Sequence, residues 1–216
     1  MKNKRVIIIA NGDLKTPAYY RELIAEEDYI ICVNGGSIHA LAIGARPDLL
    51  IGDLDSLPEI ERRQIMETKP QLIEYPAAKD KSDLELAIDY ALALNPEEVV
   101  IIGALGGARV DHALLNIMLL LLPLDKGIPA CILDETQQIY LCRSYLKLDG
   151  DPGDYLSLFA LSGNVEGVTT EGLKYQLQEE TLQFASSRGL SNEFTSSQAS
   201  VNIKSGLLLV IKTTRC

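Results

Sequence analysis

The chain has 216 residues, 47% of them apolar, which is enough for a substantial core in one large domain or two modest ones. Its 30 acidic residues outnumber its 20 basic ones and give a formal net charge of -10, so we expect no nucleic-acid partner. The longest apolar run, residues 117–122, is far shorter than the roughly 20 residues that cross a bilayer, and the cysteines lack CxxC spacing, so we expect a cytoplasmic protein without a membrane span.

Short apolar runs alternate with helical patterns along the first 134 residues. The runs are nearly continuous rather than alternating with polar residues, as in strands that are buried on both faces. This arrangement predicts an α/β domain with a parallel sheet. We expect its strands at Val6–Ala10, Ile30–Val33, Leu49–Ile51, Val99–Ile102 and Ala130–Leu133.

Three helices are predicted between these strands. The first begins at Pro17, a residue typical of a first helical turn, and continues to about Glu26. Ser82 and Glu85 fit the capping box of a second helix, which ends at Asn95. The third, at residues 111–122, is apolar on almost every side, so we expect it to be buried between the sheet and another layer or subunit.

The character of the sequence changes after residue 134. Turn-forming residues separate short β-rich pieces, and helical periodicity fades. The segments Ser200–Lys204 and Leu207–Lys212 flank Ser205-Gly206, which predicts a hairpin. We therefore expect an α/β domain at residues 1–134 and an antiparallel β-sandwich or small barrel at residues 135–216.

Two aspartates follow the predicted strand at Leu49–Ile51. Asp53 and Asp55 stand two residues apart, so their side chains share one side if the chain stays extended. Ligands of open α/β sheets bind at the carboxyl ends of strands, where magnesium is often shared between carboxylates and phosphates. The alternative is that both aspartates are solvated turn residues.

A second acidic turn, at residues 79–85, opens the helix capped by Ser82. Asp83 lies in the first helical turn, where a carboxylate complements the helix dipole. That structural role is sufficient to explain it in isolation. However, the turns that follow parallel strands all emerge at one edge of the sheet, so Asp83 can converge with Asp53 and Asp55.

A glycine-rich segment at residues 103–112 follows the strand at Val99–Ile102. Its glycines would let backbone N–H groups approach phosphates, and Arg109 offers a fork of donors. Asp111 could bind metal or accept a proton. The alternative is a glycine turn with a surface salt bridge, and for His39 and His112 we favour structural roles.

Taken together, these blocks resemble the thiamine pyrophosphokinase family, which transfers diphosphate from ATP to thiamine and releases AMP. The resemblance covers nearly the whole chain and implies an α/β catalytic domain followed by a β-sandwich domain. It also implies Mg²⁺ and a homodimer whose sites are shared between subunits. The matching blocks, in the family's order, are Asn34-Gly35-Gly36, Pro47-Asp48, Gly52–Ser56, Lys79–Ala87, Gly106–His112, Glu171–Tyr175 and Gly189–Glu193.

The resemblance also implies roles for particular residues. Magnesium would be held by Asp53, Asp55 and Asp83, and the polyphosphate would contact Arg109. Ser191 and Asn192 would lie near the thiamine pyrimidine ring. We therefore expect as catalytic residues Asp53, Asp55, Asp83, Arg109 and Asp111, and as binding residues Asn34, Gly35, Lys79, Asp80, Arg109, Ser191 and Asn192.

Two positions depart from the family's pattern. Asn34 stands where the family usually has aspartate, so the acidic cluster has one carboxylate fewer. Ala108 intervenes between Gly107 and Arg109, where glycine is usually followed directly by arginine. Two alternatives therefore stay open: a magnesium-dependent hydrolase of nucleotides or thiamine phosphates, and a binding module with weakened chemistry.

Overall fold

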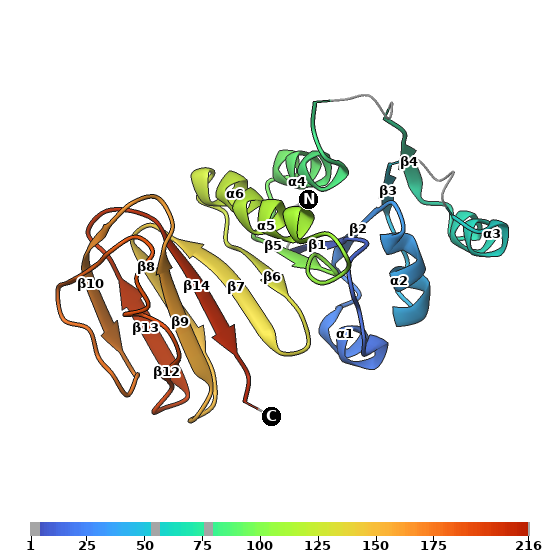
Figure 1. Cartoon of the computed structure of the whole chain (residues 1–216). Coiled ribbons are helices and arrows are strands. Elements are labelled where there is room, and N and C mark those ends of the chain that lie inside the picture. The colour runs from blue at the N-terminus through green and yellow to red at the C-terminus, as the bar shows by residue number, and fades with distance from the viewer. Residues whose placement is uncertain (1–4, 53–56, 76–79, 216) are drawn as a thin grey trace. The chain divides into compact units, whose positions relative to one another are not determined.

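The computed structural model describes residues 5–52, 57–75 and 80–215. These residues form two compact units, Met1–Glu135 and Thr136–Cys216 (Figure 1). The first unit is α/β with a parallel sheet, and the second consists of antiparallel strands. The predicted fold class is confirmed.

The sheet of the first unit has the strand order β6-β5-β1-β2-β3-β4, and all of these pairs are parallel. Its strands are β1 Arg5–Ile9, β2 Tyr29–Val33, β3 Leu49–Ile51, β4 Gln71–Ile73, β5 Glu98–Ile102 and β6 Ala130–Leu133. The five predicted strands are present, and Val6–Ile9 of β1 is fully buried, as continuous apolar runs require. β4 was not predicted because it is short and begins with an exposed glutamine.

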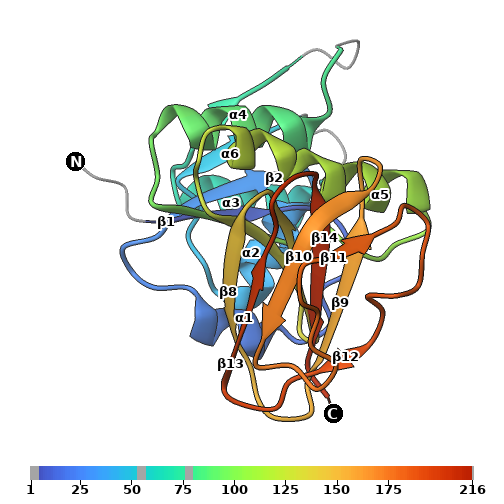
Figure 2. The same cartoon turned by 90° about the vertical axis from the view of Figure 1, so that its left-hand side faces the viewer.

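Six helices are described in the first unit: α1 Pro17–Leu23, α2 Gly36–Ile43, α3 Glu59–Glu67, α4 Asp83–Ala93, α5 Val110–Leu119 and α6 Leu121–Asp125. α1 and α2 lie on one face of the sheet, whereas α4, α5 and α6 lie on the other (Figures 1 and 2). The predicted cap of α4 is confirmed, because Ser82 Oγ accepts a hydrogen bond from the Glu85 N–H at 3.2 Å.

The apolar helix predicted at residues 111–122 differs from expectation in two ways. It is divided at Leu120 into α5 and α6, in agreement with Pro123, which has no N–H to continue the helical ladder. Four side chains of α5 are also well exposed on the single chain, so burial against another layer of the described chain is not seen, and burial against another subunit stays a prediction. The exposed side chains are Val110 (79%), Leu114 (52%), Leu115 (41%) and Met118 (46%). None of the helices in the described part of the chain is long and apolar enough to cross a membrane.

The second unit is a β-sandwich. Its strands are β7 Gln137–Cys142, β8 Tyr145–Asp149, β9 Tyr155–Ala160, β10 Val165–Glu171, β11 Glu180–Leu182, β12 Asn192–Glu193, β13 Gln198–Asn202 and β14 Leu208–Thr213. The strand orders are β12-β9-β14-β7 on one side and β11-β10-β13-β8 on the other. Inward side chains of both sets, such as Leu158 and Val201, form one buried core.

The predicted hairpin around Ser205-Gly206 is wrong. β13 pairs with β8 and β10, whereas β14 pairs with β7 and β9, so the chain passes from one sheet to the other at this turn. Gly206 has φ 103, a backbone conformation that favours glycine. The alternating pattern reports which face of each strand is buried, and both strands do bury that face in the common core, but the pattern does not identify the neighbouring strand.

Candidate active site

The candidate site of the first unit lies where the strand order reverses. β1 and β5 are parallel neighbours, and their last residues, Ile9 and Ile102, stand side by side. The chain continues from β1 toward β2 in one direction and from β5 toward β6 in the other. Open α/β sheets bind ligands outside the carboxyl ends of strands at such a switch point. A cavity of about 580 Å³ opens at this edge of the sheet.

The loops that follow β1 and β5 are joined to each other beside this cavity. The Gly12 N–H donates to the Gly103 carbonyl at 2.6 Å, and the Asp13 N–H donates to the Leu105 carbonyl at 2.8 Å. His39 Nε2 lies 2.8 Å from the Gly12 carbonyl oxygen, in keeping with a structural role. Asn116 Nδ2 donates to the Ala104 carbonyl at 2.8 Å, which ties α5 to the same loop.

Asn11, Gly12 and Asn116 line the cavity but were not among the predicted site residues. The sequence contained a signal for the first two, because the polar turn Asn11-Gly12-Asp13 directly follows a buried parallel strand. For Asn116 we find no such signal, since a single asparagine within an apolar helix has no distinctive spacing.

Glycines are needed where these loops approach each other. Gly106 has φ 77, and a Cβ at this position would overlap the Asp13 side chain. Gly35, which was predicted as a binding residue, is buried against the Asn11 side chain and is not one of the cavity-lining residues. Its smallness allows the start of α2 to approach the loop after β1.

Asn34 and Asp83 are brought together although they are 49 residues apart in sequence. Asn34 Nδ2 donates to Asp83 Oδ2 at 2.7 Å, and both residues line the cavity. Asn34 Oδ1 is buried and accepts no hydrogen bond from the described residues. An unsatisfied buried acceptor of this kind costs about 1–3 kcal/mol, so a cation or a donor at this point would stabilise it.

The end of β3 lies directly against this pair. Gly52 has φ 124, and a Cβ there would overlap the Asn34 side chain. Gly52 immediately precedes Asp53, but Asp53, Asp55 and Lys79 lie outside the described residues. Within residues 5–52, 57–75 and 80–215, no group of three or more His, Cys, Asp and Glu side chains could hold a metal ion. The Asn34 amide oxygen and the Asp83 carboxylate are nonetheless the hard oxygen ligands that Mg²⁺ prefers.

Arg109 lines the cavity and is paired with Asp111. Its Nε donates to Asp111 Oδ1 at 3.0 Å, and its Nη2 contacts Asp111 Oδ2. The hydrogen bond from Arg109 lowers the pKa of Asp111 to about 2, so this carboxylate stays ionised at neutral pH. The surface salt bridge that was the alternative prediction for this segment is therefore present. It leaves Arg109 about two-thirds exposed and able to meet an anion in the cavity.

Lys81, which precedes α4, is paired with two acidic side chains of that helix. Lys81 lines the cavity, and its Nζ lies 2.6 Å from Asp89 Oδ2 and 3.3 Å from Glu85 Oε1. These contacts raise the pKa of Lys81, chiefly through the hydrogen bond to Asp89. Asp80, predicted as a binding residue, is exposed and is not one of the cavity-lining residues.

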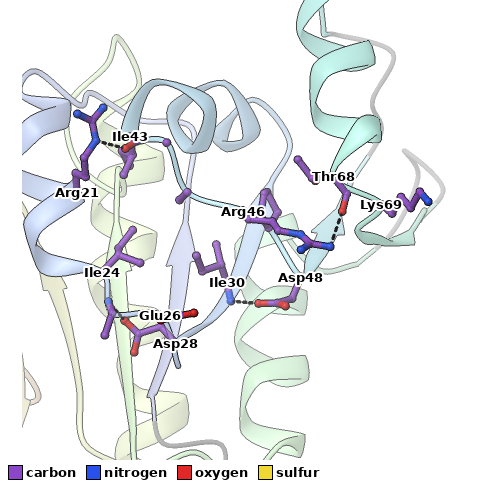
Figure 3. A pocket seen from close by; sticks show the side chains of 14 residues that line it. Arg21, Ile24, Glu26, Asp28, Ile30, Ile43, Arg46, Asp48, Thr68 and Lys69 are labelled. Carbon is purple, nitrogen blue, oxygen red and sulfur yellow. Dashed lines mark hydrogen bonds between the residues drawn. The ribbon is translucent and has the colours of Figure 1, made fainter.

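A larger hollow of about 780 Å³ lies at the opposite, amino-terminal edge of the sheet (Figure 3). Several of its polar side chains form hydrogen bonds with the backbone around them. Arg21 Nε donates to the Ile43 carbonyl at 2.7 Å, and Asp48 Oδ2 accepts from the Ile30 N–H at 2.8 Å. These bonds stabilise the loops between helices and strands, and this edge is not where parallel sheets bind ligands.

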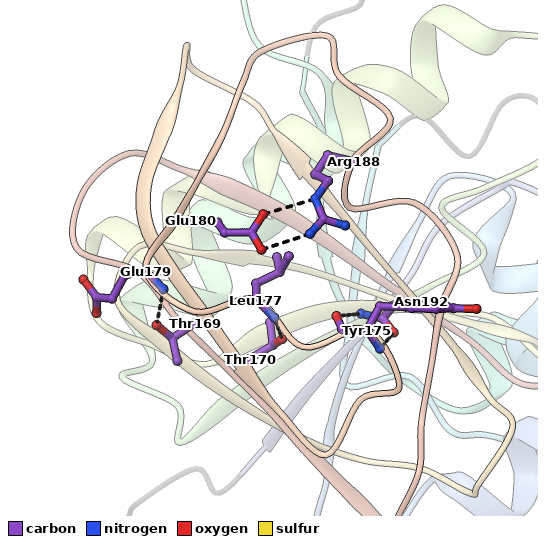
Figure 4. Close-up of polar contacts among 8 residues, drawn as sticks. All are labelled: Thr169, Thr170, Tyr175, Leu177, Glu179, Glu180, Arg188 and Asn192. Atoms are coloured by element: carbon purple, nitrogen blue, oxygen red, sulfur yellow. Dashed lines mark hydrogen bonds and ion pairs between the residues drawn. The ribbon is translucent and has the colours of Figure 1, made fainter.

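The second unit contains the remaining predicted residues. Asn192 is buried and lines a cavity of about 160 Å³, together with Tyr175 and Arg188. The Asn192 amide is bonded on both sides to the Tyr175 backbone, with Oδ1 accepting at 2.9 Å and Nδ2 donating at 2.7 Å (Figure 4). Ser191 is exposed, has φ 54 and donates its N–H to Ser157 Oγ. Asn192 thus holds the segment that carries Tyr175.

The two units correspond to two family models. The thiamin pyrophosphokinase catalytic domain matches residues 20–132, and the thiamin pyrophosphokinase vitamin B1 binding domain matches residues 143–208. The chain belongs to the thiamin pyrophosphokinase family. The matched catalytic region contains Asn34, Asp83 and Arg109, and the B1-binding region contains Asn192.

Individual members of the family are similar over the full chain. A thiamine pyrophosphokinase of Bacillus subtilis is 32% identical over 98% of this chain and 99% of its own length. The crystal structure of the Bacillus subtilis enzyme superposes with a TM-score of 0.90, covering 99% of this chain and 100% of that one at 30% identity. A thiamin pyrophosphokinase family protein from Enterococcus faecalis gives a TM-score of 0.81 at 30% identity, again over 99% and 100% of the chains.

Proposed function

We propose that this chain transfers the diphosphate of ATP to the hydroxyl group of thiamine, which gives thiamine diphosphate and AMP. The observation that carries the proposal is the cavity at the β1–β5 switch point, lined by Asn34, Asp83 and Arg109 in the region that matches the family's catalytic domain. The thiamine oxygen attacks the β-phosphorus and forms the new O–P bond. The bond from that phosphorus to the bridging oxygen of the α-phosphate breaks, AMP leaves, and the hydroxyl proton is released.

The residues of the cavity would act mainly by positioning the polyphosphate and neutralising its charge. We propose that Asp53, Asp55 and Asp83 supply oxygen ligands for Mg²⁺, which would offset negative charge on the phosphates when bound. Arg109 would contact the polyphosphate together with backbone N–H groups of the glycine-rich loop. Lys79, Lys81 and Asp80, which precede α4, would border the nucleotide.

We propose that thiamine is bound by the segments around Ser191 and Asn192 in the second unit. Support comes from the match of this unit to the family's vitamin B1 binding domain and from the small cavity that Asn192 lines. Because its amide is already bonded to Tyr175, Asn192 would act by holding that residue's segment in place. We place the reaction in the cytoplasm, where ATP is available and buried thiols such as Cys32 and Cys142 stay reduced.

Product analysis tests the proposed reaction. The purified chain is incubated with ATP and thiamine, with and without Mg²⁺, and AMP and thiamine diphosphate are quantified together. We expect equal amounts of both products and their loss when Mg²⁺ is chelated. AMP without thiamine diphosphate would indicate the hydrolase instead, and tight thiamine or nucleotide binding without turnover at any Mg²⁺ concentration would indicate a binding module.

We also propose that the chain forms a homodimer through α5. The exposed side chains Val110, Leu114, Leu115 and Met118 provide an apolar helix face of the kind that marks protein–protein contacts. Leu115 also lines the cavity, so a second chain on this face would lie beside the active site.

Leu114→Glu is expected to convert the dimer to a monomer, because it would bury an unpaired carboxylate in an apolar contact. The measurement is molar mass by light scattering after size-exclusion chromatography. Ile60→Glu, at an apolar residue of α3 that is 72% exposed, is the matched control and should remain dimeric. A wild-type chain with the mass of one chain would rule out the dimer, and a dimeric Leu114→Glu variant would exclude this face as the interface.

A further inference from the structure

The two polar atoms of the Asn34 side chain differ in their surroundings. On one side its Nδ2 donates to Asp83 Oδ2 at 2.7 Å. On the other side its Oδ1 is buried against the end of β3, beside Gly52, and no donor from the described ranges reaches that oxygen. A buried polar atom without a partner in an otherwise bonded cluster indicates the place of a missing ligand.

We propose that Asn34 is a positioning residue for Asp83 and, at the same time, a neutral ligand of the bound cation. Its side-chain Nδ2 fixes the Asp83 carboxylate before the cation binds, and its Oδ1 becomes one of the oxygen ligands when the cation is bound. The inference deepens the proposed function and rests on it for the identity of the ion as Mg²⁺.

An amide suits this position because it is a donor on one side and an acceptor on the other. A carboxylate at position 34 would place two negatively charged oxygens within hydrogen-bond distance, with no proton between them, until a cation arrived. Asn34 removes this repulsion, so Asp83 is ordered without metal. One negative charge fewer among the ligands also lowers the affinity for the cation.

The backbone conformation of Asn34 provides another reason for an asparagine at this position, and mutation can separate the role of the backbone from that of the side chain. Its φ of 48 lies in the left-handed region, where asparagine and glycine are both favourable. Asn34→Gly therefore keeps the backbone conformation and removes only the side chain. Asn95, with φ 50 at the end of α4, is a matched control, because Asn95→Gly makes the same change away from the cavity.

Binding of Mn²⁺ alone, followed through the electron paramagnetic resonance signal of the unbound ion, tests the proposal without turnover. Asn34→Gly is expected to weaken Mn²⁺ binding by roughly 10- to 100-fold, the usual effect of losing a group that orients a metal ligand. Asn95→Gly should bind Mn²⁺ like the wild type. Asn34→Asp should bind Mn²⁺ roughly tenfold more tightly because it adds a charged ligand.

Thermal unfolding provides the second measurement. In EDTA, Asn34→Asp should have a lower Tm than the wild type because two carboxylates face each other, and saturating Mn²⁺ should raise its Tm by more than it raises that of the wild type. Unchanged Mn²⁺ affinity in Asn34→Gly, equal losses in Asn34→Gly and Asn95→Gly, or no Mn²⁺ binding by the wild-type chain would each overturn the proposal.

The two proposals can fail separately. If the wild type forms no thiamine diphosphate but Mn²⁺ affinity still depends on Asn34, the proposed function is wrong and the role of Asn34 stands. If thiamine diphosphate is formed while Mn²⁺ affinity does not respond to position 34, the function stands and Asn34 is only a backbone residue.

Discussion

Asp83→Asn is expected to lower the rate of AMP and thiamine diphosphate formation by roughly 100- to 1,000-fold, the size of effect seen when one charge-stabilising group is removed from an active site. Asp83 lines the switch-point cavity and holds its carboxylate 2.7 Å from Asn34 Nδ2. Asparagine preserves the size of the side chain but removes its negative charge, so the cation is bound more weakly. The measurement is the initial rate over a wide range of Mg²⁺ concentrations.

The folded structure should tolerate this substitution. Ser82 still caps α4, and the loss of a carboxylate from the first helical turn costs roughly 0.3–2 kcal/mol. Glu85→Gln is the matched control, because it removes another carboxylate from the same turn, at a residue that does not line the cavity. A Glu85→Gln variant as slow as Asp83→Asn would attribute the effect to the helix, and an Asp83→Asn variant with the wild-type rate would remove Asp83 from the metal site.

Arg109→Ala is expected to lower kcat/KM for ATP by roughly 100-fold or more, because one donor aimed at developing phosphate charge is worth about this much. Arg109→Lys should fall between the wild type and Arg109→Ala, since it keeps the charge but loses the planar fork. Arg109 lowers the pKa of Asp111 to about 2, and without Arg109 an aspartate still has its ordinary pKa of about 4, so this carboxylate is ionised in both the wild type and the variant. The loss should therefore be independent of pH between about 6 and 9.

Two further variants show whether the loss is specific to Arg109 and what its partner Asp111 does. Arg63→Ala removes another exposed arginine that is paired with a carboxylate, Glu67, but on α3, and should leave kcat/KM unchanged. Asp111→Asn releases Arg109 from its salt bridge, so KM for ATP should fall if Asp111 and phosphate compete for the guanidinium. A large loss of kcat in Asp111→Asn would instead assign Asp111 to the chemistry, and a wild-type Arg109→Ala would exclude Arg109 from polyphosphate binding.

The order of the motifs along the chain determined more of the candidate site than any one of them did. In isolation, Asp83 was sufficiently explained as a residue that complements the dipole of α4. Its proximity to Asn34 follows from the parallel sheet, in which every strand-to-helix turn emerges at the same edge. The contributions of Asn11 and Asn116 became visible only from the cavity that they line.

By itself, the sequence determined five of the six described strands of the parallel sheet and the class of each unit. Continuous apolar runs such as Val6–Ile9 must be buried on both faces, and Ser82 marks the capped start of α4. Both features depend on residues that are close together in the sequence. The tertiary structure alone decided which elements are neighbours: the β1–β5 switch point, the Asn34–Asp83 hydrogen bond, and the passage between sheets at Gly206 where a hairpin was predicted. Periodicity specifies which face of an element is buried, but the partner that buries it is chosen by packing of the whole chain.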